Sequence, residues 1–112
     1  MTVNKFEELD CWSVARELVA YVYKITKSDS CRRDYGYVDQ IRRAAVSVMN
    51  NVAEGFHRGS NKDFIRFLYI ARASAAEVRS MTYVGIDQGY ISESEFNDLQ
   101  DLCRRCVDYH GA

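Results

Sequence analysis

Residues 38–55 read VDQIRRAAVSVMNNVAEG, and the spacing of their apolar side chains is the clearest structural signal in the chain. Apolar residues recur there at intervals of three and four, at Val38, Ile41, Ala45, Val48 and Val52. This spacing follows one face of an α-helix, whereas a half-buried strand would alternate at every second residue. The same periodicity in three further stretches predicts four amphipathic helices, at about residues 9–28, 36–56, 61–87 and 93–109. The core positions predicted in those three stretches are Leu9, Trp12, Ala15, Val19, Val22 and Ile25 or Thr26; Phe64, Phe67, Ala71, Ala75, Val78 and Thr82; and Phe96, Leu99, Cys103, Cys106 and His110.

The ends of the predicted helices carry signals of their own. The chain has no proline, the residue that most often interrupts a helix, and its six glycines lie mainly at the predicted breaks. Ser60 and Ser92 each precede an acid by three residues, a pattern typical of the capping box, and Asp34 is a candidate cap for the helix that follows it. Short connections favour antiparallel neighbours. We therefore expect an all-α protein with one domain over residues 1–112, a single antiparallel up-down-up-down four-helix bundle.

Length and composition are those of an ordinary soluble domain. The 112 residues are 47% hydrophobic and 28% charged, which excludes a disordered or collagen-like chain. No apolar stretch is long enough to span a membrane, and residues 1–10 (MTVNKFEELD) lack the pattern of a secretory signal. We therefore expect a cytoplasmic protein without a membrane partner, whose four cysteines stay reduced.

Charge is distributed unevenly along the chain. Residues 31–79 carry nine basic and five acidic groups, and residues 80–112 carry two basic and six acidic groups. The basic residues beside the third predicted helix fall within an arc of about 140°; they are Arg58, Lys62, Arg66, Arg72 and Arg79. Ile65, Tyr69 and Ala76 lie among them, on the side facing away from the core. Three interpretations remain open: a solvated helix face, a contact between subunits, or a nucleic-acid surface on which Tyr69 stacks.

A polar stripe lies opposite the apolar face of the second predicted helix. Its members are Gln40, Arg43, Ser47, Asn51 and Glu54. An antiparallel register that places Arg43 level with Glu77 also places Glu54 level with Arg66, so we predict two ion pairs between the second and third helices. Such exposed pairs contribute only about 0–1 kcal/mol each, so their value would lie in alignment. The alternative is that these are coincidental surface charges.

No catalytic signature is present. The chain has no glycine-rich phosphate loop and no His-Glu-x-x-His motif, and we expect neither enzymatic activity nor a cofactor. Residues 103–106 (CRRC), with His110, could suggest a metal or redox site. Zinc usually takes four ligands, and redox pairs lie at helix starts, whereas this pair lies late in a helix on the core stripe. Core filling by Cys103 and Cys106 is the favoured interpretation, and we expect no metal.

Several segments together resemble a known family. They are residues 9–12 (LDCW), 35–55 (YGYVDQIRRAAVSVMNNVAEG), 64–74 (FIRFLYIARAS), 76–78 (AEV) and 89–91 (GYI). They resemble the bacterial four-helix-bundle family encoded in 23S ribosomal RNA intervening sequences, which includes the accessory variability protein of diversity-generating retroelements. The resemblance implies an antiparallel bundle that assembles as a ring-like homopentamer, and it assigns a structural role to the motif positions Gln40, Arg43, Ser47, Asn51, Glu54 and Glu77.

The resemblance also frames two functional hypotheses. The retroelement relative binds nucleic acid and a reverse transcriptase through a markedly basic surface, whereas this chain has a formal net charge of −1. The first hypothesis is a non-enzymatic, self-associating bundle that offers its basic stripe to RNA or DNA. The second is a protein-interaction scaffold without a nucleic-acid role, in which the basic hairpin of one subunit docks on the acidic last helix of another.

Overall fold

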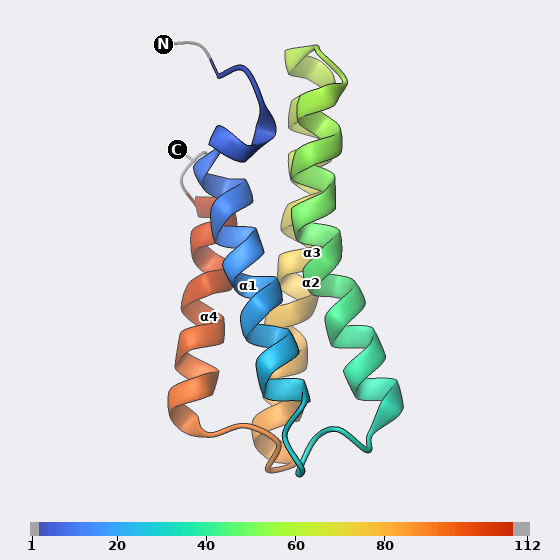
Figure 1. The fold of residues 1–112 in the computed structure, drawn as a ribbon, viewed down its shortest axis with the longest axis vertical. Helices are drawn as coiled ribbons and strands as arrows, with labels where there is room; N and C mark the ends of the chain where they lie inside the picture. The colour runs from blue at the N-terminus through green and yellow to red at the C-terminus, as the bar shows by residue number, and fades with distance from the viewer. Residues whose placement is uncertain (1–2, 109–112) are drawn as a thin grey trace.

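Four helices dominate the computed structural model, which describes residues 3–108 (Figure 1). They are α1 (Asp10–Thr26), α2 (Tyr35–His57), α3 (Asn61–Asp87) and α4 (Glu93–Asp108), and the short 3-10 helix η1 (Phe6–Glu8) precedes them. No strand occurs within residues 3–108, so the expected all-α class is confirmed. The predicted bounds agree to within two residues wherever residues 3–108 allow the comparison.

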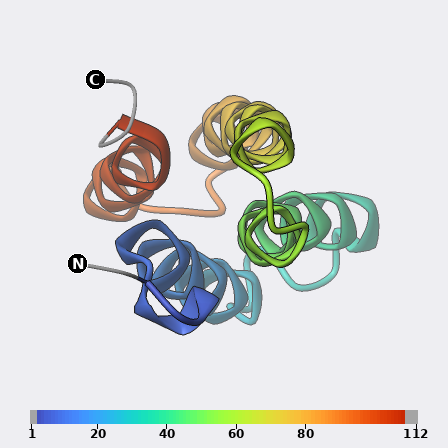
Figure 2. The same cartoon turned by 90° about the horizontal axis from the view of Figure 1, so that it is seen from above.

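The helices form an antiparallel bundle in which each packs against two neighbours. α1 packs against α2, α2 against α3, α3 against α4, and α4 against α1. Seen from above, the four helices occupy the corners of a distorted square (Figure 2). The molecule measures 44 × 23 × 19 Å, because the α2–α3 hairpin extends beyond the shorter α1 and α4 (Figure 1).

The three predicted helix caps are present. Asp34 accepts a hydrogen bond from the Tyr37 amide at 3.2 Å, and Ser60 accepts one from the Asp63 amide at 3.2 Å. At the start of α4, Ser92 Oγ accepts from the Glu95 amide at 3.1 Å, and Glu95 Oε1 accepts from the Ser92 amide at 2.8 Å. This reciprocal pair is a complete capping box.

The core follows the predicted apolar faces, although six of the predicted positions are only partly buried: Leu9, Trp12, Val19, Val38, Phe64 and Phe96. Ile41, Ala45, Val48 and Val52 of α2 are fully buried. On α1 the predicted Ala15 and Val22 are fully buried, and so is Leu18, which was not among the predicted core positions. Because α1 contacts both α2 and α4, its buried face is wider than a single three-and-four stripe. The predicted core position His110 lies outside the described residues.

Two glycines set how closely α2 and α3 approach. A Cβ on Gly55 would lie 2.7 Å from the Phe67 Cβ, and one on Gly85 would lie 2.6 Å from the Tyr37 hydroxyl. That hydroxyl donates to the Met81 carbonyl at 2.9 Å, inside the core. The α2–α3 contact is therefore close at both ends of the hairpin. None of the helices within residues 3–108 combines the length and the apolar character that a membrane crossing requires.

Candidate interaction surface

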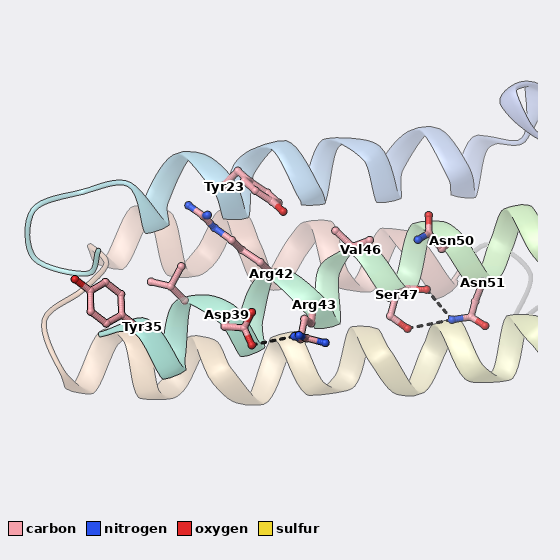
Figure 3. A pocket seen from close by; sticks show the side chains of 10 residues that line it. Tyr23, Tyr35, Asp39, Arg42, Arg43, Val46, Ser47, Asn50 and Asn51 are labelled. Atoms are coloured by element: carbon pink, nitrogen blue, oxygen red, sulfur yellow. Dashed lines mark hydrogen bonds and ion pairs between the residues drawn. The ribbon is translucent and has the colours of Figure 1, made fainter. Parts of the chain in front are cut away.

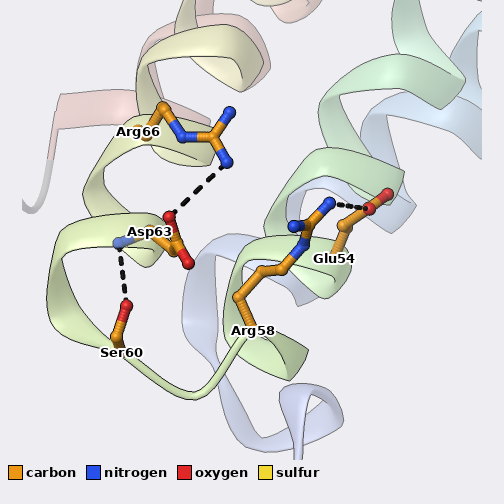
Figure 4. Close-up of polar contacts among 5 residues, drawn as sticks. All are labelled: Glu54, Arg58, Ser60, Asp63 and Arg66. Carbon is orange, nitrogen blue, oxygen red and sulfur yellow. Dashed lines mark hydrogen bonds and ion pairs between the residues drawn. The ribbon is translucent and has the colours of Figure 1, made fainter.

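Two cations of the predicted basic stripe lie where α2 meets α3. Arg58 and Arg66 both lie against the ring of Phe67, with their guanidinium carbons 4.9 and 4.6 Å from its centroid. Each also has an acid on its own helix: Arg58 pairs with Glu54 at 3.0 Å and Arg66 with Asp63 at 3.5 Å (Figure 4). Local partners therefore offset the positive charge at this end of the hairpin.

The other three cations have different surroundings. Arg79 Nε donates to Gln100 Oε1 of α4 at 3.0 Å. Lys62 and Arg72 are exposed and form no ion pair or hydrogen bond with the rest of residues 3–108. The stripe is thus divided between the α2 side and the α4 side of α3, and Lys62 and Arg72 are its two available cations.

The outer face of α3 is unusually apolar. Among residues 3–106, whose burial is described, seven large hydrophobic side chains are exposed, and five of them belong to α3. We call this face the α3 ridge; its members are Ile65 (52% exposed), Tyr69 (64%), Ile70 (40%), Tyr83 (55%) and Val84 (45%), with the exposed Ala73 and Ala76 between them. Sequence reasoning placed Ile65, Tyr69 and Ala76 on this face. It missed Tyr83, although Tyr69, Ala76 and Tyr83 follow one another at intervals of seven residues, a spacing that places them on the same face of a helix.

The two predicted ion pairs between α2 and α3 are wrong. Arg43 pairs with Asp39 at 2.9 Å instead of with Glu77, and Glu54 pairs with Arg58 instead of with Arg66. In each case an opposite charge three or four residues away on the same helix is within easier reach than one on the neighbouring helix.

The antiparallel alignment of α2 with α3 that was assumed in predicting those ion pairs is nevertheless close to the observed alignment. Ser47 Oγ and Ser74 Oγ are 2.8 Å apart across the two helices, and Gln40 Nε2 donates to Glu77 Oε2 at 3.3 Å. Asn51 donates to the carbonyl oxygen and the hydroxyl of Ser47 at 2.8 and 3.0 Å. The polar stripe therefore contacts α3 through hydroxyl and amide groups instead of through charge pairs.

A groove of about 670 Å³ runs along the outer face of α2 (Figure 3). We call it the α2 groove; it is lined by Tyr23, Tyr35, Val38, Asp39, Arg42, Arg43, Val46, Ser47, Asn50 and Asn51. Arg42 stacks 4.3 Å over the ring of Tyr23 and donates from Nε to Thr26 Oγ1 at 2.9 Å. Sequence reasoning missed Tyr23 and Arg42, because their proximity depends on how α1 packs against α2.

The cysteines fill the core. Cys103 and Cys106 are 0% and 2% exposed, and burial raises the pKa of each thiol to about 12. Within residues 3–108 no group of three or more His, Cys, Asp or Glu side chains is placed to hold a metal ion. His110, the third residue considered for such a site, lies outside the described residues.

These features describe an antiparallel helical bundle whose distinctive surfaces belong to the α2–α3 hairpin. Residues 7–109 match the family described as 23S rRNA-intervening sequence protein, and the chain belongs to that family. Its fold is similar to the crystal structure of a protein of unknown function from the S23 ribosomal protein family of Bacteroides thetaiotaomicron, with a TM-score of 0.78 and 21% identity over 88% of this chain and 92% of that one. Comparison with curated proteins finds no significant match.

Proposed function

We propose that the protein is a non-enzymatic, cytoplasmic bundle that self-associates through the outer face of α3. The α3 ridge is the observation that supports this proposal. By the usual size of such side chains, its five large members expose roughly 400 Å² of apolar area, in the range at which a surface patch often marks an interaction site. The family resemblance favours a ring-like homopentamer as the assembled form.

The polarity of the other helices also supports an interface on this side. The exposed side chains of α1 are mostly polar, and those of residues 93–106 of α4 are all polar or charged. Tyr23 is the one large exposed hydrophobic on those two helices up to residue 106, and Arg42 covers one face of its ring. Burying the outer face of α3 against another copy would therefore cover five of the seven large exposed hydrophobic side chains described for residues 3–106.

Molar mass in solution tests self-association. We expect light scattering to give a multiple of the 12.9 kDa chain, and five chains if the pentamer is correct. Tyr69→Arg should reduce the mass, because it replaces the most exposed ridge side chain with a charge. Ser13→Arg on the outer face of α1 is the matched control and should leave the mass unchanged. A wild-type protein that stays monomeric at 100 µM, a concentration of order 10⁻⁴ M, would refute the proposal.

Binding of RNA or DNA is a second candidate function. Lys62 and Arg72 support it, because both are exposed on α3, the helix that carries Tyr69, and neither side chain has a partner within residues 3–108. Cations that meet phosphates release counterions, so affinity should fall steeply with salt, by a slope of about one per contact. Filter binding of Lys62→Gln with Arg72→Gln should show weaker affinity and a smaller slope, and Arg104→Gln on α4 controls for net charge. Binding that is absent at low salt, or insensitive to salt, would exclude this function.

A protein-interaction scaffold without a nucleic-acid role is the alternative. In this arrangement, the basic hairpin of one subunit would dock on the acidic α4 of another. Asp101 of α4 already pairs with Arg104 at 2.8 Å and with Arg105 at 3.7 Å, which leaves less negative charge for a partner. Arg66→Glu with Arg72→Glu should lower the oligomer mass if this docking holds, and an unchanged mass would count against it.

A further inference from the structure

Arg42 is fixed at the centre of the α2 groove by contacts that leave part of its guanidinium free. Its Nε donates to Thr26 Oγ1 at 2.9 Å, and its guanidinium carbon lies 4.3 Å from the centroid of the Tyr23 ring. Thr26 Oγ1 in turn donates to the Val22 carbonyl of α1 at 2.7 Å. The two terminal nitrogens of Arg42 have no hydrogen-bond or ion-pair partner within residues 3–108. Such a pair of fixed donors is suited to a phosphate or a carboxylate.

The charge of Arg42 is also the one that the groove does not neutralise. Three charged residues line the groove, and two of them, Asp39 and Arg43, pair with each other at 2.9 Å. Arg42 is partly buried, and no carboxylate of residues 3–108 lies within ion-pair distance of it. The groove therefore carries one unpaired positive charge at a fixed position, which favours a ligand with one anionic group.

An exposed aromatic ring lies on the same side of α2 as Arg42. Tyr35, Val38 and Arg42 recur at intervals of three and four residues, which aligns them along the helix. In Figure 3 the Arg42 guanidinium extends toward the end of the groove at which Tyr35 lies. Tyr35 is 78% exposed, and neither its ring nor its hydroxyl has a partner within residues 3–108. A free aromatic face of this kind can stack on a flat ring of a ligand.

The size and lining of the groove favour one small ligand. Its volume of about 670 Å³ lies within the range of small-molecule sites, roughly 300–1,000 Å³. A nucleic-acid strand would need several cations for its successive phosphates, whereas the lining residues provide one unpaired cation. A peptide helix would need an apolar stripe, whereas Val38 and Val46 are the only aliphatic side chains among the lining residues. A ligand with one flat ring and one phosphate agrees with both observations.

We propose that the α2 groove binds a free mononucleotide, with its base stacked on Tyr35 and Val38 and its phosphate bound by the terminal nitrogens of Arg42. The lining residues all come from α1 and α2, so the site is complete in one subunit and does not depend on the proposed self-association. A bound nucleotide would also strengthen the contact between these two helices, because Arg42 joins α2 to Thr26 of α1.

Ligand-observed NMR with three probes tests the two parts of this site. Saturation transfer from the protein should reach the ring protons of 5′-AMP, with a dissociation constant of about 1 mM or below. Adenosine, which lacks the phosphate, and inorganic phosphate, which lacks the ring and is added as a competitor, should each bind at least about tenfold more weakly than AMP. Either probe binding as tightly as AMP would overturn the proposal, and so would the absence of AMP binding at about 10 mM.

Two variants locate the bound nucleotide. Arg42→Gln should weaken AMP binding by about tenfold or more, because it removes charged hydrogen bonds to the phosphate. Tyr35→Ser should weaken it by about fivefold or more, because the base loses its stacking surface. Since Tyr35 has no partner within residues 3–108, its variant tests the site without disturbing the contact between α1 and α2. Arg104→Gln and Tyr69→Ser remove an exposed arginine and an exposed tyrosine elsewhere and should bind AMP like the wild type.

Two further results would contradict the proposal. AMP binding that is unchanged in Tyr35→Ser would place the nucleotide outside the groove. An adenine trinucleotide that binds more than about tenfold tighter than AMP would identify a nucleic-acid strand as the occupant instead of a free nucleotide. The molar mass of the wild type enters neither result, so a failure of this proposal is distinct from a failure of self-association.

Discussion

Single residues on α2 and α3 determine how closely these helices pack. Gly55 leaves no room for a side chain beside Phe67, and Gly85 leaves none beside the Tyr37 hydroxyl. Gly36, at the start of α2, differs: a Cβ there would lie 4.0 Å from Asp34 Oδ1, which is ordinary van der Waals contact. The three glycines are therefore not equivalent, although all lie in helices.

Gly55→Ala should destabilise the fold by about 1–3 kcal/mol, the usual cost of forcing extra volume into a packed contact. The added methyl would meet the Phe67 Cβ at 2.7 Å, so the two helices must separate or shift. Gly36→Ala is the matched control and should be neutral or stabilising by up to about 1 kcal/mol, because alanine loses less conformational entropy in a helix. Urea unfolding measures both, and equal stabilities for the two variants would contradict the close α2–α3 contact at Gly55.

At the scale of elements, the two connections at the lower end of the bundle in Figure 1 are tied to each other. The Tyr90 hydroxyl, which follows α3, donates to Asp34 Oδ2, and Asp34 also caps α2. The hydrogen bond from Tyr90 and then that from the Tyr37 amide lower the pKa of the Asp34 carboxyl. One carboxylate therefore joins the start of α2 to the end of α3.

This pKa shift predicts a pH dependence of stability. A carboxyl whose pKa is lower in the folded protein contributes stability above its unfolded pKa of about 3.9, and that contribution disappears as the pH falls through the folded pKa. Asp34→Asn keeps a good helix cap but cannot titrate, so it should be less stable than the wild type at pH 7. The difference should narrow as the pH falls from 5 to 3. Asp87→Asn is the exposed control, and a gap that widens in acid would refute the role given to Asp34.

Sequence patterns predicted the elements better than the contacts between them. Helices, caps and the α2 core face depend on residues three or four positions apart, which the sequence displays directly. Arg43 and Glu54 show why side-chain partners are harder to predict: each had acceptable partners on its own helix and on the next, separated by small free-energy differences. The α2 groove was missed for another reason. Tyr23 and Arg42 meet only after α1 and α2 have packed, so no local pattern indicates the groove.

For the whole molecule, the buried thiols report how the bundle opens. Cys103 and Cys106 are inaccessible, and their raised pKa values leave almost no thiolate at pH 8. They should therefore react with a disulfide reagent only after α4 leaves the bundle.

We expect both thiols to be labelled at the same slow rate in the native protein, because they lie on one helix one turn apart and become exposed in the same opening event. Labelling should accelerate in parallel as urea is added. Mass spectrometry of labelled peptides separates the two sites, with the unfolded protein as the control for intrinsic reactivity. Fast labelling of either cysteine in the absence of urea would show that the end of α4 opens independently of the remaining bundle.

The polar outer faces of α1 and α4 have a practical consequence. If copies meet through their α2–α3 hairpins, Ser13 and Asn97 point toward solvent in every subunit of the assembly. Fluorescent dyes attached at these two positions would then record the formation and dissociation of the assembly in real time, without entering any contact that they are meant to observe.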